Sequence, residues 1–129
     1  MPTPQDLMRI GQDLIEHCKA GTESELHDSL YATEAVSVEA IAPPSGSAEA
    51  IGLAAIKAKN EWWYGAHELH AMEVEGPFIH GTDRFCVIFG IDVTETASGV
   101  RRQMREVATY YVNGAGQIIR EEFAYPVEA

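Results

Sequence analysis

Two glutamates lie at strand positions where the surrounding alternation calls for apolar side chains. Glu106 falls within QMREVATYYV, residues 103–112, and Glu121 within QIIREEFAY, residues 117–125. Both segments are rich in β-branched and aromatic residues, which favour strands. Two carboxyl groups on one apolar wall cannot both ionise without cost, because burial and mutual repulsion each favour protonating one of them. We therefore expect Glu106 and Glu121 to share a proton and to be able to act as general acid and base near neutral pH.

The loops that flank these strands decide which residues lie opposite one another. NGAG and TASG both have the composition of hairpin loops. Four-residue loops at both places put Glu106 opposite Phe89 and Phe123, and Glu121 opposite Ala108. The two glutamates then become diagonal neighbours on one face of the sheet. The rest of that face is apolar and consists of Phe85, Val87, Phe89, Ile91, Met104, Ala108, Tyr110, Ile119, Phe123 and Tyr125.

Other assignments of the two glutamates stay open at this point. A one-residue change in either loop would move them to the opposite face of the sheet. They could also lie at the rim of a cavity, solvated or paired with an arginine, since structural networks perturb carboxyl groups too. The pattern indicates that the two groups are close together and leaves their chemistry open.

The elements that must position these residues begin with three helices. A first amphipathic helix is predicted between a Thr3 cap and Gly21. A second, short helix starts at Thr22, in a segment with the sequence pattern of a capping box. A third helix is predicted from a Ser47 cap as far as Trp62.

Strands make up the rest of the predicted structure. One short strand is expected at AVSVEAIA, and four longer strands are expected at residues 67–74, 84–94, 101–112 and 117–125. Helices followed by a meander of long strands indicate an α+β domain with an antiparallel sheet covered on one face. Long strands that curve strongly around helices leave a concave cavity, and such cavities commonly hold ligands.

Composition limits the class of protein and of partner. The chain has 129 residues, enough for one domain and too few for two, so residues 1–129 are expected to form a single domain. Its formal net charge of −11 would repel nucleic acid and anionic membranes. No apolar run approaches the roughly 20 residues that cross a bilayer. Cys18 and Cys86 resemble buried residues of a reducing compartment, so we expect a cytoplasmic protein.

Five segments that span nearly the whole chain share a recognisable pattern: LYATEAVSVEA, GLAAIKAKNEWW, GTDRFCVIFGIDVT, SGVRRQMREVATYYV and GQIIREEFAYP. Together they resemble the SnoaL-like branch of the nuclear transport factor 2-like superfamily. The resemblance implies a cone-shaped α+β roll, with a curved sheet around helices, and a homodimer joined through the outer sheet face. Apolar outer residues that a monomer would leave exposed fit such an interface, namely Cys86, Ile88, Val107, Tyr111 and Ile118.

The same resemblance implies where a ligand would bind. The superfamily includes polyketide cyclases, a ketosteroid isomerase, a scytalone dehydratase and a limonene epoxide hydrolase, together with binding modules that perform no chemistry. Its pockets place polar side chains on the first strand, at the positions held here by Ser37 and Glu39. Its cyclases and isomerases use a carboxylate or histidine base in an apolar pocket, with donors for the enolate. Either glutamate of the pair would be the base, and Tyr110 or Tyr125 the donor.

The remaining pocket candidates are aromatic. Trp62 and Trp63 end the third helix, where they would pack on the core or stack on a planar ligand. Phe89 and Phe123 would line the wall beside the glutamates. No phosphate, nucleotide or metal motif is found, so no cofactor and no metal are expected. Two functions stay open: a cofactor-independent isomerase, cyclase or dehydratase acting on a small, largely apolar molecule, and a non-catalytic dimeric ligand-binding or interaction module.

Overall fold

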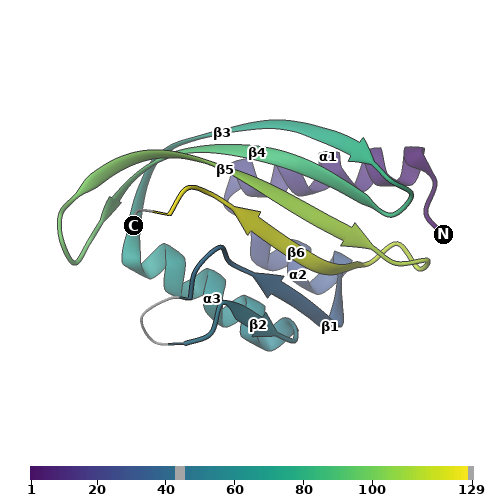
Figure 1. Cartoon of the computed structure of the whole chain (residues 1–129), viewed down its shortest axis with the longest axis horizontal. Helices are drawn as coiled ribbons and strands as arrows, with labels where there is room; N and C mark the ends of the chain where they lie inside the picture. Colours follow the sequence, from purple (N-terminus) through teal and green to yellow (C-terminus); the bar gives the residue numbers. More distant parts are fainter. Residues whose placement is uncertain (43–45, 128–129) are drawn as a thin grey trace.

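The chain forms three helices and six strands in the computed structural model, which describes residues 1–42 and 46–127. In chain order the elements are α1 Pro4–Ala20, α2 Glu23–Leu30, β1 Tyr31–Val38, β2 Glu49–Ile51, α3 Leu53–Ala66, β3 His67–His80, β4 Arg84–Glu95, β5 Arg101–Val112 and β6 Ile118–Ala124. Figure 1 shows the long strands β3, β4 and β5 curving over the helices. The predicted α+β fold, with three helices and a strongly curved sheet, is confirmed.

The strands form one open sheet in the order β2-β1-β6-β5-β4-β3. Neighbouring strands are antiparallel except β1 and β6, which run parallel. The sheet is therefore mixed, whereas the sequence predicted an antiparallel one. A parallel neighbour needs a long crossover connection. The chain between β1 and β6, which contains α3 and the β3 to β5 meander, provides that connection.

Local sequence signals fix both ends of α1. Thr3 Oγ1 accepts a hydrogen bond from the Asp6 N–H, and the Asp6 carboxylate accepts one from the Thr3 N–H. These two bonds complete a capping box. Gly21 ends the helix in the left-handed conformation, with φ of 71°, which glycine adopts without steric cost. The predicted first helix is confirmed.

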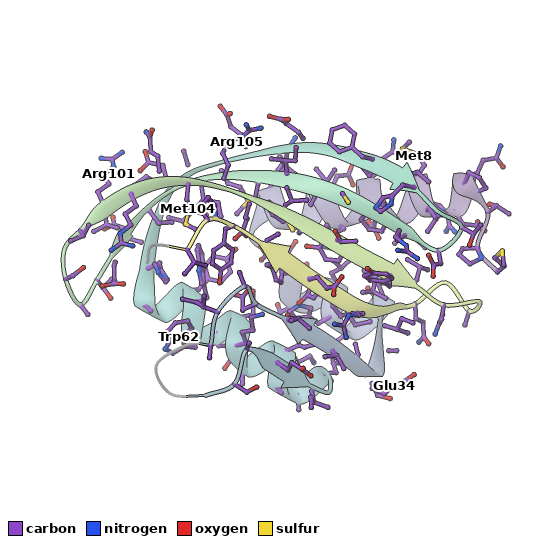
Figure 2. The ribbon with its side chains drawn as sticks, in the orientation of Figure 1. Met8, Glu34, Trp62, Arg101, Met104 and Arg105 are labelled. Carbon is purple, nitrogen blue, oxygen red and sulfur yellow. The ribbon has the colours of Figure 1, made fainter. Side chains whose placement is uncertain are left out.

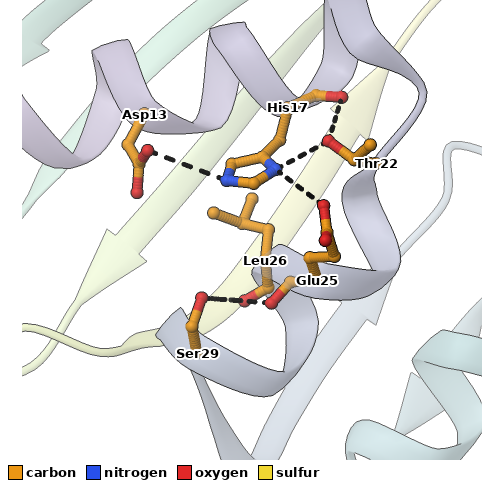
Figure 3. A network of polar contacts seen from close by, with 6 residues as sticks. All are labelled: Asp13, His17, Thr22, Glu25, Leu26 and Ser29. Carbon is orange, nitrogen blue, oxygen red and sulfur yellow. Dashed lines mark hydrogen bonds and ion pairs between the residues drawn. The ribbon is translucent and has the colours of Figure 1, made fainter.

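The corner between α1 and α2 uses a different contact from the predicted one. Thr22 makes no capping hydrogen bond to α2. Its hydroxyl lies 2.7 Å from Nδ1 of His17 and also reaches the His17 carbonyl (Figure 3). The imidazole faces Asp13 at 3.8 Å and Glu25 at 4.0 Å. The predicted capping box at Thr22 is wrong, because the end of α1 holds the hydroxyl that would have capped α2.

A short strand replaces the predicted start of the third helix. β2 pairs with β1, with Ile51 opposite Val36, and α3 begins after Gly52 and continues to Ala66. Ser47 Oγ accepts a hydrogen bond from the N–H of Glu49 and caps no helix. The predicted start is wrong because the free edge of β1 offers backbone partners that compete with the local capping pattern.

Strand β3 extends through the segment GPFIH, which the sequence predicted as a loop, and ends at His80. Its pairing with β4 is irregular between Glu75 and Phe78, where Pro77 has no N–H to donate. Gly11 of α1 lies against this point, since a Cβ added there would be 2.6 Å from Cβ of Pro77. The missing side chain therefore allows α1 to approach β3 closely.

The pairing of the long strands decides where the two glutamates lie. In the β4–β5 pair, Glu106 lies opposite Phe89, as predicted. In the β5–β6 pair the predicted register is wrong by two residues, because Ala108 lies opposite Phe123 rather than Glu121. Because side chains alternate between the two faces with a period of two, a shift of two residues leaves Glu121 on the predicted face.

A bulge in β6 reverses the predicted sides of two isoleucines. Tyr111 pairs with Arg120 and Val112 with Ile118, so Ile119 is the extra residue. Ile118, predicted on the outer face, is fully buried, and Ile119, predicted inside, is only partly buried. Both predictions are wrong because they assume strict alternation of side chains, and the extra residue of a bulge shifts that alternation by one.

The two faces of the sheet differ in chemistry. The inner face packs buried apolar side chains such as Phe85 and Val87 against the helices. The outer face carries ion pairs, including Arg101 with Asp92 and Arg105 with Glu75. Figure 2 shows both arginines on this outer side. Within the described residues, no helix is long and apolar enough to span a membrane.

Candidate functional site

A cavity of about 140 Å³ lies between the curved sheet and the helices. Each of the three helices contributes apolar side chains to its wall, among them Leu14, Leu26 and Ile56. Among the described residues, the carboxyl, amine and imidazole groups on the wall belong to Glu23, Glu39, Glu106, Glu121, Lys59 and His27. A largely apolar space with a few converging polar groups is typical of small-molecule sites.

Glu106 enters the cavity from β5 with an unusually high pKa. Burial first, and then the negative charge of Glu39, raise its pKa from an ordinary value of 4.5 to about 7. The ammonium group of Lys59 acts in the opposite direction, and Glu121 adds a smaller rise. Among the described residues, no hydrogen bond contributes to the shift. Glu106 is therefore a carboxyl group that can gain or lose a proton near neutral pH.

Glu121 enters from β6 and is held by hydrogen bonds. The carboxyl accepts a bond of 2.5 Å from the Tyr31 hydroxyl, and Ser37, which lies opposite on β1, also donates to it. Burial raises the pKa of Glu121, while both hydrogen bonds lower it. Only 6% of the residue is exposed. Glu121 is thus fixed to its neighbours, whereas no residue that the structure describes pairs with the Glu106 carboxyl.

Lys59 links the helix side of the cavity to the sheet. Its Nζ donates to Ser37 Oγ at 2.7 Å and lies 3.5 Å from Glu39 Oε1. The ammonium group also lies 4.9 Å above the ring of Phe123, within the range of a cation–π contact. Burial raises the pKa of Glu39 although Lys59 lowers it. The second carboxyl oxygen of Glu39 is buried without a hydrogen-bond partner among the described residues.

The sequence profile of the SnoaL-like domain matches residues 8–125 of this chain. The chain belongs to the SnoaL-like family. The resemblance drawn from the sequence is therefore confirmed, and the cavity lies inside the cone of the SnoaL-like fold.

Solved structures of similar proteins agree with this assignment. A candidate SnoaL-like polyketide cyclase from Mesorhizobium loti is 37% identical, covers 91% of this chain and 97% of its own, and superposes with a TM-score of 0.82. Rv0760c from Mycobacterium tuberculosis, in complex with estradiol-17β-hemisuccinate, is 19% identical, with coverage of 95% for both chains and a TM-score of 0.75. A Δ5-3-ketosteroid isomerase from Mycobacterium sp. is 19% identical, with coverage of 94% and 93% and a TM-score of 0.66. No curated protein matches the chain by sequence.

In this SnoaL-like protein most of the predicted site residues line the cavity. These residues are Glu39, Trp63, Phe89, Glu106, Tyr110, Glu121 and Phe123. Ser37 is fully buried and lies behind the wall, where it contacts Lys59 and Glu121. Trp62 and Tyr125 are not part of the lining. Trp62 is 51% exposed, because consecutive helix residues point about 100° apart and Trp63 takes the inward position.

The two glutamates are not the diagonal neighbours that the predicted register implied. Glu121 lies opposite Tyr110, and the next inward-facing pair along the two strands is Ala108 with Phe123. This pair lies between Glu121 and Glu106. Glu39 consequently has a larger effect on the pKa of Glu106 than Glu121 has. The carboxyl with the largest effect on the pKa of Glu106 is thus that of Glu39, which directly follows β1.

Several residues of the cavity wall are not among the predicted site residues. Lys59 and Asn60 occupy the stripe of α3 that begins at Ile56 and ends at Trp63, and this helical spacing could have revealed them. Tyr31, the first residue of β1, also lines the cavity. In the described part of the chain, no group of three acidic, histidine or cysteine side chains is arranged to hold a metal ion.

Proposed function

We propose that this protein binds a small, largely apolar carbonyl or hydroxy compound in the cavity and moves a proton on it, with Glu106 as general base. The observation that carries the proposal is the pKa of Glu106, raised to about 7 by burial and then by Glu39. A general base works best when its pKa lies near the working pH. Glu121 suits the role less well, since Tyr31 and Ser37 already donate to its oxygens.

In the proposed reaction, the Glu106 carboxylate takes a proton from the carbon next to a carbonyl group. The electrons of the broken C–H bond move to the carbonyl oxygen, and the resulting enolate needs a hydrogen-bond donor. Tyr110 lines the cavity, and burial followed by the charge of Glu121 raises its pKa, so its hydroxyl stays protonated and able to donate. In a substrate with a C=C bond next to the acidic carbon, return of the proton to the far carbon of that bond gives the conjugated isomer. In a substrate with a β-hydroxyl group, the enolate electrons form a C=C bond as the β C–O bond breaks, and the hydroxyl leaves with the proton as water.

A non-catalytic dimeric ligand-binding module is the second proposal. It is supported by Glu39, whose second oxygen is buried and unpartnered within the described residues, and by Lys59, which Ser37 and Glu39 hold in place. Such fixed polar groups can orient a ligand without chemistry. The complex of Rv0760c with estradiol-17β-hemisuccinate illustrates ligand binding by a protein of this fold.

We also propose a cytoplasmic homodimer that joins through the outer face of the sheet. Exposed apolar side chains on that face support the interface, because Phe78 and Val107 are 50% and 40% exposed. The free thiols of Cys18 and Cys86 support a reducing compartment. The net charge of −11 supports partners other than nucleic acid and anionic membranes.

Proton exchange on a simple ketone tests the catalytic proposal. The bicyclic ketone 2-tetralone is incubated with the protein in D₂O, and loss of its α-proton signals is followed by NMR. We expect the native protein to accelerate exchange and Glu106→Gln to lower the rate about 100-fold or more, the usual contribution of a general base. Glu75→Gln, which changes a carboxyl on the outer face, should behave as the native protein does. Equal rates for the native protein and Glu106→Gln would contradict the assignment of the base, and binding without any exchange would favour the non-catalytic module.

A further inference from the structure

The helix side of the cavity contains a buried polar group that the described residues leave unsatisfied. His27 of α2 lines the cavity and is only 5% exposed. Its Nδ1 atom is buried without a hydrogen-bond partner in the described ranges. A buried donor or acceptor without a partner costs free energy, so a group that enters the cavity and pairs with this imidazole would be stabilised.

The charge state of His27 restricts what that group can be. Burial lowers the pKa of His27, and the positive charge of Lys57 lowers it further, although Asp28 acts in the opposite direction. The imidazole is therefore neutral near neutral pH, with one nitrogen that donates and one that accepts. The edge-to-face contact with Tyr31, at 4.9 Å between ring centroids, fixes the ring against the wall.

The polar groups of the cavity are divided between its two walls. Glu106 and Glu121 enter from the sheet, whereas Glu23 and His27 enter from α2, and Lys59 and Asn60 enter from α3. On the helix side, Glu23 accepts a hydrogen bond from the Tyr64 hydroxyl, and Lys59 is paired with Ser37 and Glu39. The neutral imidazole of His27 and the neutral amide of Asn60 then face the carboxyl groups of the sheet wall. A ligand that satisfies both walls needs a polar group at each end and an apolar body between them.

We propose that the ligand carries, besides the group that meets Glu106, a second polar group that is a hydroxyl and that hydrogen-bonds to the His27 imidazole. A hydroxyl both donates and accepts, so it suits either tautomer of the ring. A carboxylate is disfavoured by the carboxyl groups already in the cavity, and an ammonium group is disfavoured beside the positive charge of Lys57. The inference rests on the proposed function, because it assumes that the cavity holds the ligand.

Two ketones that differ by one hydroxyl test the inference. Calorimetric titration compares 2-tetralone with 6-hydroxy-2-tetralone, in which the hydroxyl lies at the far end from the carbonyl. We expect the native protein to bind the hydroxylated ketone about five- to tenfold more tightly, the effect of one additional hydrogen bond to a buried group. His27→Phe, which keeps an aromatic ring against Tyr31, should bind both ketones equally. His70→Phe changes an exposed histidine on the outer face and should keep the native preference.

Each result bears on the inference. Equal affinity of the native protein for the two ketones would overturn it and leave the cavity as a binding site. A preference that persists in His27→Phe would overturn the assignment to His27. Binding of neither ketone would contradict the proposed function and the inference together. Nitrogen-15 NMR of the native protein gives an answer that does not depend on the variant: the hydroxylated ketone should shift an imidazole signal of His27 and 2-tetralone should not, and identical responses would count against the inference.

Discussion

The hydroxyl of Tyr31 donates a hydrogen bond of 2.5 Å to the carboxyl of Glu121, between the first and the last strands of the chain. Tyr31 is itself buried, so both groups of this bond are removed from water. Ser37 adds a second donor to the same carboxyl. Glu121 is in this way part of the structure that holds β1 beside β6, whereas Glu106 has no hydrogen-bond partner within the described ranges.

Removal of the Tyr31 hydroxyl should destabilise the protein. Tyr31→Phe leaves Glu121 buried with one donor fewer, and we expect a loss of about 1–3 kcal/mol in the free energy of unfolding. The pKa of Glu121 should rise as well, because the Tyr31 hydrogen bond lowers it. Urea unfolding at pH 7 measures the loss. Tyr64→Phe is the matched control, since it removes a less buried hydroxyl bonded to Glu23. A loss in Tyr31→Phe no larger than that of the control would contradict this prediction.

Removal of the Lys59 charge should shift the pH dependence of catalysis. Lys59 lowers the pKa of Glu106, so Lys59→Met should raise it above its native value of about 7. The 2-tetralone exchange rate should then reach its plateau at higher pH, and at pH 7 it should fall roughly three- to tenfold because less of Glu106 is ionised. Lys57→Met, on the same helix but paired with Asp28, should keep the native profile. An unchanged midpoint in Lys59→Met would show that Lys59 does not act on the base.

A glycine in α1 should resist substitution, in contrast to one in α3. Gly11→Ala would put a Cβ 2.6 Å from Cβ and 2.8 Å from Cγ of Pro77. Since a proline ring has little freedom to move, we expect a loss of about 1–3 kcal/mol from overpacking. Gly65→Ala meets nothing within 4 Å, so this change should stabilise the helix by up to about 1 kcal/mol. Thermal and urea unfolding of both variants test the contrast, and equal stability of the two would refute the close approach of α1 to β3.

The proposed dimer should depend on the outer face of the sheet. Solution scattering at micromolar concentration is expected to give twice the chain mass of 14.1 kDa. Val107→Glu would place a charge among exposed apolar side chains and should reduce the mass to that of one chain. Val100→Glu, at a comparably exposed valine before β5, should leave the dimer intact. A native mass of one chain would exclude the proposed dimer at that concentration.

The sequence was sufficient to predict the fold and the wall on which the glutamates lie. The period of two kept Glu121 on the correct face even though its predicted partner was wrong by two residues. The loop length between β5 and β6 did not reveal the bulge at Ile119, which depends on how the last strand meets the core. The parallel pairing of β1 with β6 joins distant parts of the chain, and local patterns do not encode it.

The site was predicted less completely than the fold. Lys59 cannot be predicted as an inward residue from its type, because lysine side chains mostly lie on the solvent face of a helix. His27 follows Leu26 in a helix too short for a clear period. Its burial results from the packing of α2 against Tyr31, which becomes visible only in three dimensions.

Titration of the Glu106 carboxyl tests the proposed base most directly. Protein with carbon-13 in its glutamate carboxyl groups is titrated by NMR, and Glu106→Gln identifies the signal. The proposed base requires a midpoint of about 7, well above the ordinary value of 4.5, as burial and Glu39 imply. A midpoint near 4.5 would contradict the assignment of Glu106 as the general base.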